Sequence, residues 1–88
     1  MKYRIYDDND ICIYETNNGI SAIVFEIAIN SGLSKEKAEK LSFFAYECWL
    51  KSDESFDVYR FADWASKNPD CIKLSRSQAL DAFNNLDN

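Results

Sequence analysis

The chain contains no histidine, the residue that most often serves as general base and metal ligand. Its absence removes the usual partner of a serine or cysteine nucleophile and the usual nitrogen ligand of zinc. Two carboxylates, Glu26 and Glu47, lie among apolar residues, where burial would raise their pKa. Neither implies a pocket with converging groups, so we expect both to face solvent or to pair with a lysine. The sequence therefore predicts a protein that is not an enzyme.

Glycine and proline are scarce, with two and one residues respectively. This disfavours an all-β barrel, which needs turn residues every 8 to 12 positions or so. The sequence also has no phosphate-binding glycine loop and no nucleophile elbow. Asp7, Asp8 and Asp10 resemble a fragment of a calcium loop, but its glycine and its distal glutamate are missing. We expect no metal and no cofactor.

Cysteine is present in an odd number, as Cys12, Cys48 and Cys71, and no CxxC pair occurs. This pattern favours reduced, packed thiols in a cytoplasmic protein. The first ten residues lack the apolar stretch of a signal peptide. The longest apolar run, Ala22–Ile29, is interrupted by Glu26 and is far shorter than the roughly 20 residues of a membrane span. We expect no membrane association.

The 88 residues contain a large apolar fraction, 47% of the chain. Aromatic residues alone make up 15% of the chain. This content excludes disorder and predicts one domain over residues 1–88. The formal charge is −5, so the basic patch of a nucleic-acid-binding protein is not expected. The abundance of Asn, Ile, Lys, Asp and Ser suggests an AT-rich bacterial or phage source.

The N-terminal segment predicts a β-hairpin. Residues Tyr3–Tyr6 and Ile11–Glu15 are rich in tyrosine and isoleucine, which favour strands, and Asp7–Asp10 between them has the chemistry of a turn. The register stays open, because loops of two, three or four residues give different faces. A three-residue loop would place four apolar residues on one face: Tyr3, Ile5, Ile11 and Ile13.

Residues Ile20–Asn30 allow two interpretations. Apolar residues alternate from Ile23 to Ile29 as in a strand, and Asn18-Gly19 before them is a hairpin signal. The same segment has a helical stripe formed by Ile20, Ile23, Val24 and Ile27. The end of the segment favours the helix, because Gly32 followed by the apolar Leu33 matches a Schellman stop.

Three further helices are predicted. The first runs from Lys35 to about Ser52 after the cap Ser34, with a core stripe of Ala38, Leu41, Phe44, Ala45, Cys48 and Trp49. The second runs from Phe56 to Lys67, with Asp53–Ser55 as a loop and negative N-terminal cap. After an extended connector, Cys71–Leu74, the third runs from Arg76 to Leu86 behind a capping box of Ser75 and Gln78. The predicted fold is α+β, an N-terminal β-hairpin packed on three to four α-helices.

Aromatic residues exceed what one helix face can hold. In the second of these helices Val58, Phe61, Ala62 and Ala65 form one face, and Phe56, Tyr59 and Trp64 are assigned to the other. In the first, Phe43, Tyr46 and Leu50 lie opposite the core stripe. Each extra set either packs within the chain or stays exposed as a binding surface. The candidate protein-binding residues are Phe43, Tyr46, Leu50, Phe56, Tyr59 and Trp64, with Asp57 and Asp63 in an acidic rim.

These observations favour a small acidic, non-enzymatic protein-interaction module, an accessory or inhibitor protein that binds a protein partner. A homodimer that buries Phe56, Tyr59 and Trp64 is the simplest way to cover an exposed aromatic face. A narrower version is an inhibitor of a nucleic-acid-handling complex, of the anti-restriction or anti-CRISPR type, with the acidic rim facing a basic partner. The alternative is a helix-turn-helix regulator that places Lys35, Lys37 and Lys40 near DNA phosphates, where Glu36, Glu39 and Glu47 would be repelled.

Overall fold

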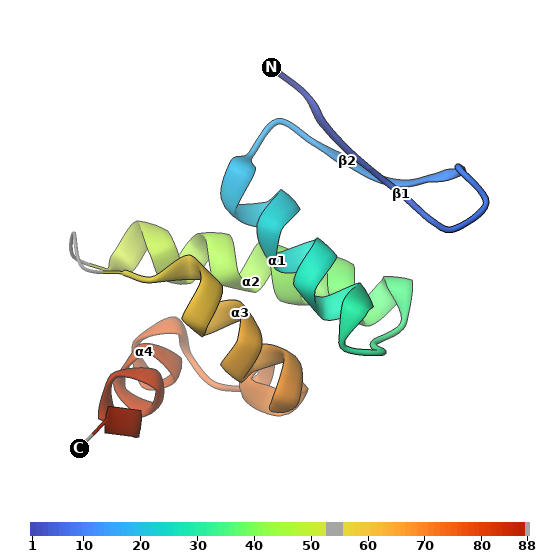
Figure 1. Cartoon of the computed structure of the whole chain (residues 1–88). Coiled ribbons are helices and arrows are strands. Elements are labelled where there is room, and N and C mark those ends of the chain that lie inside the picture. The colour runs from blue at the N-terminus through green and yellow to red at the C-terminus, as the bar shows by residue number, and fades with distance from the viewer. Residues whose placement is uncertain (53–55, 88) are drawn as a thin grey trace.

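The computed structural model describes residues 1–52 and 56–87. Within them, an N-terminal hairpin of β1 (Tyr3–Tyr6) and β2 (Cys12–Thr16) is followed by four α-helices and two short 3₁₀ helices (Figure 1). The predicted α+β fold is thus confirmed. The helical elements are α1 (Gly19–Asn30), α2 (Lys35–Lys51), α3 (Val58–Lys67), η1 (Pro69–Lys73), α4 (Arg76–Asn84) and η2 (Asn85–Asp87). The predicted cap at Asp53–Ser55 lies outside the described residues.

The hairpin is antiparallel, and its register has an irregularity between Ile5 and Tyr6. Ile5 pairs with Tyr14, so these two residues share the face that packs on the helices, while Ile11 is exposed. The Asp7 carboxylate fixes the turn by accepting from the backbone N–H groups of Asn9 and Ile11 at 2.8 and 3.0 Å. This turn and the irregularity prevent the arrangement in which Ile5, Ile11 and Ile13 share one face with Tyr3.

Residues 19–30 form a helix, as the stop signal indicates. The Asn18 side chain accepts from the Ser21 N–H at 3.0 Å and caps the first turn. At the other end, the Leu33 N–H donates to the Ala28 carbonyl at 3.1 Å and the Gly32 N–H donates to the Ile29 carbonyl. Gly32 has φ of 95°, so this is the predicted Schellman motif.

Helix α2 carries most of the predicted core stripe. Ser34 caps it by accepting from the Lys37 N–H at 3.2 Å. Trp49 is the exception in the stripe, because 41% of it is exposed. It lies at the edge of the stripe, where its ring packs beside Tyr46 with centroids 5.9 Å apart. The stripe residues that are buried as expected are Ala38, Leu41, Phe44, Ala45 and Cys48.

Helix α3 begins two residues later than predicted. Asp57 is its N-cap and accepts from the backbone N–H groups of Tyr59 and Arg60 at 3.1 Å each. Phe56 therefore precedes the helix, and its ring lies 5.2 Å from Phe61 and 6.2 Å from Phe83.

The predicted extended connector at Cys71–Leu74 is wrong, because Pro69–Lys73 forms the 3₁₀ helix η1. Proline suits the first turn of a helix, and the Cys71 N–H donates to the Asn68 carbonyl at 2.9 Å. Helix α4 has the predicted capping box but ends at Asn84, and η2 continues the chain.

The core lies where α1, α2 and α3 meet, and its largest fully buried side chains include Phe25, Leu41 and Phe61. Figure 1 shows the hairpin beside α1, with α4 at the opposite end of the molecule. The hairpin is attached through Tyr14, whose ring stacks on Phe25 with centroids 4.2 Å apart. One side of α2 is left uncovered by the described residues, since Phe43 and Leu50 on it are 62% and 59% exposed.

Candidate functional site

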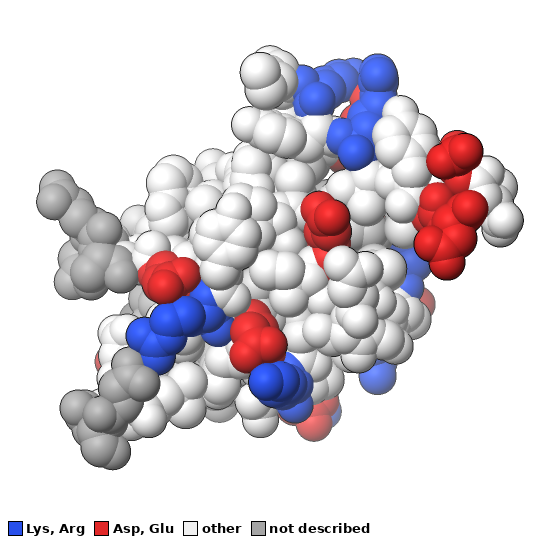
Figure 2. Space-filling model, in the orientation of Figure 1, with Lys and Arg blue, Asp and Glu red and all other residues white. Residues whose placement is uncertain are grey.

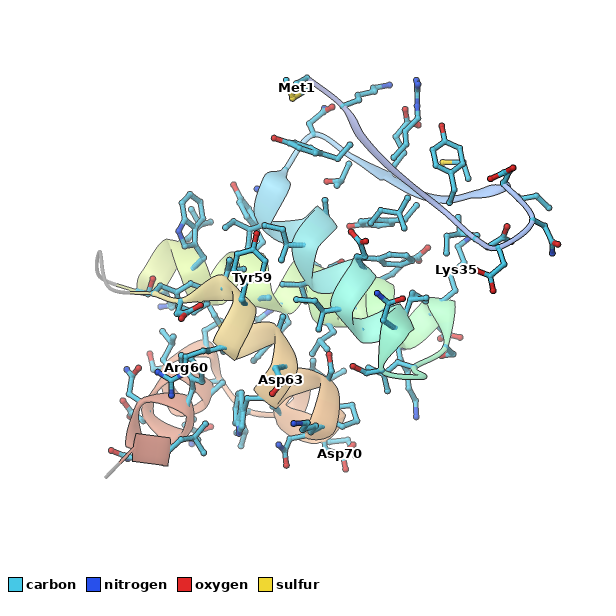
Figure 3. All side chains as sticks on the ribbon, viewed as in Figure 1. Met1, Lys35, Tyr59, Arg60, Asp63 and Asp70 are labelled. Atoms are coloured by element: carbon cyan, nitrogen blue, oxygen red, sulfur yellow. The ribbon has the colours of Figure 1, made fainter. Side chains whose placement is uncertain are left out.

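The structure separates the three aromatic residues that the sequence grouped around α3. Trp64 is half-buried, with its ring 5.5 Å from Phe61 and 5.8 Å from Phe83, so it belongs with Phe56 to the aromatic core. Tyr59 remains 62% exposed, in the first turn of α3 (Figure 3). Five residues correspond to about 140° on a helix, so Tyr59 and Trp64 flank the buried stripe on opposite sides. The grouping of Phe56, Tyr59 and Trp64 on one face is therefore wrong.

The predicted acidic rim is also divided. The Asp57 carboxylate is engaged in the cap of α3, and Asp63 pairs with Lys67 at 3.1 Å. Figure 2 shows red and blue atoms side by side in this area, where Figure 3 labels Arg60 and Asp63. The described part of the rim is a surface of mixed charge.

The second predicted set lies together on the uncovered side of α2. Phe43 is 62% exposed and Leu50 is 59% exposed, and Tyr46 between them is half-buried. Trp49 extends this surface through its contact with Tyr46. We refer to Phe43, Tyr46, Trp49 and Leu50 as the α2 outer face. Phe43 and Leu50 point away from the core residues of the same helix, as the helical period requires, and Tyr46 and Trp49 continue the face toward the edge of the core stripe.

An apolar hollow of about 390 Å³ adjoins the α2 outer face. We call it the α2–η1 hollow. Phe43 and Phe44 of α2 and Ile72 of η1 supply its apolar walls, and both signs of charge surround it. Its lining residues are Glu39, Lys40, Phe43, Phe44, Ile72 and Arg76.

Arg76 closes one side of the hollow. Its guanidinium lies over the Phe44 ring, 5.0 Å from the centroid, and forms an ion pair with Glu47. No local sequence pattern indicates this arrangement, because Arg76 and Glu47 are 29 residues apart. Glu47 was expected to face solvent or to pair with a lysine, and in the structure it pairs with an arginine. Glu26, the other apolar-flanked carboxylate, is exposed.

The three thiols are free but not all packed. Cys12 is exposed on β2, so the expectation of three buried thiols is wrong for it. Burial raises the pKa of Cys48 to about 12 and that of Cys71 to about 11. These two thiols are held in the uncharged form, which is a poor nucleophile and a poor metal ligand. Among the described residues, no three His, Cys, Asp or Glu side chains cluster closely enough to hold a metal ion.

Two of the three lysines of the suggested helix-turn-helix, Lys35 and Lys40, are paired with neighbouring acids. Lys35 lies 3.9 Å from Glu39, and Lys40 lies 3.2 Å from Glu36, each one turn along α2. The start of α2 therefore presents both signs of charge, which suits a solvated helix surface better than contact with phosphates.

Within residues 1–52 and 56–87, no helix has the length and apolar character needed to cross a bilayer. Comparisons with protein-family models, curated proteins and solved structures found no match to this chain. The α2 outer face and the adjoining hollow are the candidate functional site.

Proposed function

We propose that this chain is a small non-enzymatic interaction module that binds a protein partner through the α2 outer face. The observation that carries the proposal is the exposure of Phe43 and Leu50, which are seven residues apart on one side of α2. Two large apolar side chains in line on a helix form the kind of ridge that another protein surface can cover.

The energetics favour covering this ridge. A phenylalanine side chain buries about 150 to 250 Å² when fully covered, and each Å² contributes about 25 cal/mol. Polar groups border the ridge, including Glu39, Lys40 and Glu47, so the surface has an apolar centre and a charged edge. Interfaces between proteins have the same arrangement. Free thiols at all three cysteines are compatible with action in the reducing cytoplasm.

The narrower version, inhibition of a nucleic-acid-handling complex, draws its support from the net charge of −5. The pairing of Asp63 with Lys67 takes away the continuous acidic surface on which that version depends. We therefore base the proposal on the apolar ridge, and the class of partner is a protein surface with an exposed apolar patch.

The test is affinity capture with the Phe43→Gln variant and the matched control Ile11→Gln. Ile11 is 60% exposed on the hairpin, so both changes remove a similarly exposed apolar side chain without altering charge. The full chain is tagged, incubated with lysate of its source organism and eluted for quantitative mass spectrometry. We expect Phe43→Gln to reduce capture of the main partner at least tenfold and Ile11→Gln to leave it unchanged. Equal retention by the two variants would refute the proposal.

A further inference from the structure

Two apolar features lie along the outer side of α2, an exposed leucine and a shallow hollow. Leu50 protrudes near its C-terminal end. The α2–η1 hollow opens beside Glu39, Lys40 and Phe43, nearer its N-terminal end. About ten residues separate the two features, which is roughly 15 Å along the helix axis. A surface with a protrusion and a matching hollow on one face can close on itself around a two-fold axis.

We propose that the α2 outer face binds a second copy of this chain, with the two α2 helices antiparallel and each Leu50 seated in the α2–η1 hollow of the other copy. This inference rests on the proposed function and names its partner. The two-fold axis passes midway between protrusion and hollow, close to Phe43 and Tyr46. The spacing of Phe43, Tyr46 and Leu50 is the alternating three-and-four pattern by which helices pack side by side.

The charges of α2 fit this register. When Leu50 of one copy lies over Glu39 and Lys40 of the other, Phe43 lies opposite Tyr46. Lys40, which pairs with Glu36 of its own chain, then lies near Glu47 of the second copy, which pairs with Arg76, and the two-fold axis repeats this row of alternating charges. The hollow also has both signs on its border, with Glu39 beside Lys40 and Arg76. A strongly basic or acidic partner would find no large excess of opposite charge here, whereas a second copy brings the opposite charges of Lys40 and Glu47 together.

The exposed apolar area of the α2 outer face sets the expected affinity of the dimer. Phe43 and Leu50, at 62% and 59% exposure, each offer on the order of 100 Å² of apolar surface. Together with Trp49 and the half-buried Tyr46 they fall short of the roughly 800 Å² per partner found in stable complexes. The dimer is therefore reversible and depends on protein concentration in the micromolar range or above.

Sedimentation equilibrium of the purified full chain from about 5 µM to 1 mM tests the dimer. We expect the apparent mass to rise from 10.2 kDa toward twice that value. Leu50→Lys would place an ammonium group against Lys40 and Arg76 of the second copy and weaken association at least tenfold. The control, Ile11→Lys, makes the same change at an equally exposed site, and circular dichroism checks that both variants fold. A monomer at every concentration, or equal dimerisation of the two variants, would overturn the inference.

Oxidative cross-linking tests the antiparallel register. In a Cys12→Ser background the remaining native thiols are buried, so an introduced cysteine reacts first. Tyr46→Cys lies near the two-fold axis and is expected to form a disulfide-linked dimer. Lys35→Cys is exposed, but its two copies would lie roughly 29 Å apart along the axis and should remain uncrosslinked. Faster cross-linking at Lys35→Cys than at Tyr46→Cys contradicts the register.

The capture experiment separates this inference from the proposed function. In one outcome the wild-type chain stays monomeric while the Phe43→Gln variant captures less of a different protein. That result would overturn self-association and leave the protein-binding function in place. If the chain dimerises through another surface, and Phe43→Gln and Ile11→Gln capture partners equally well, both the self-association and the proposed function are overturned.

Discussion

The phenol of Tyr14 lies 3.0 Å from the hydroxyl of Ser42 and joins the hairpin to α2. The Ser42 hydroxyl donates to the Glu39 carbonyl at 2.7 Å, so Tyr14 is the donor in the bond between them. Stacking of the Tyr14 ring on Phe25 holds the phenol in place. One residue of β2 thus contacts both α1 and α2.

Tyr14→Phe is expected to lower stability by about 1 kcal/mol, because it removes this hydrogen bond and keeps the stacked ring. In a chain of this size the loss corresponds to a fall in Tm of about 4 to 8 °C. Tyr6→Phe is the control, since Tyr6 is exposed on β1 and should melt like the wild type. Thermal unfolding followed by circular dichroism measures both, and equal melting of the two variants would contradict the role of Tyr14.

The cap of α3 predicts a contrast between two aspartates. Asp57→Ala removes the acceptor of two backbone N–H groups and should cost about 1 kcal/mol of unfolding free energy. Asp63→Ala breaks only an exposed ion pair with Lys67 and should cost about 0.5 kcal/mol or less. Urea denaturation measures both. A larger loss for Asp63→Ala would show that the cap is misassigned.

The two glycines predict opposite responses to alanine. Gly32 has φ of 95°, where a Cβ is strained, so Gly32→Ala should destabilise the chain by about 1 to 2 kcal/mol. At Gly19 an added Cβ would lie 3.5 Å from the Tyr3 hydroxyl oxygen, an ordinary contact, and alanine suits a helix. Gly19→Ala should therefore match or exceed wild-type stability in the same urea experiment. Destabilisation by Gly19→Ala alone would contradict this geometry.

The different environments of the three thiols lead to predictions about their reactivity and about the pH dependence of stability. Cys12 should react with a thiol reagent at once in the native protein, and Cys48 and Cys71 only after unfolding. Burial raises the pKa of both thiols above the value of about 8.5 in an unfolded chain. Unfolding therefore releases their protons in alkaline solution, and stability should fall as the pH rises from about 9.

The control for the pH dependence is Cys48→Ala. It removes the thiol whose pKa is raised to about 12 and should show a smaller loss of stability between about pH 9 and pH 11. Urea denaturation across that range compares it with the wild type. An equal loss in the two proteins would assign the alkaline effect to other groups.

The sequence predicted the structure correctly where the pattern depends on neighbouring residues. The Schellman stop at Gly32, the caps Ser34 and Ser75 and the period of α2 each depend on residues within one or two helical turns. These signals defined most element boundaries and placed Phe43, Tyr46 and Leu50 on one side of α2.

The sequence was insufficient where residues far apart in the chain decide the outcome. The burial of Phe56 and Trp64 depends on Phe83 of α4, which no local pattern reveals. The α2–η1 hollow likewise requires Ile72 and Arg76 to meet α2 across the fold. For Tyr59 and Trp64 the error was geometric, since a five-residue spacing does not keep two side chains on one helix face.

Amide chemical-shift mapping of the labelled chain, with and without its captured partner, most directly tests whether α2 forms the binding surface. We predict that the shifts that change on binding cluster between Glu39 and Leu50 and in η1. Changes confined to the hairpin or to α3, with α2 unperturbed, would contradict the account.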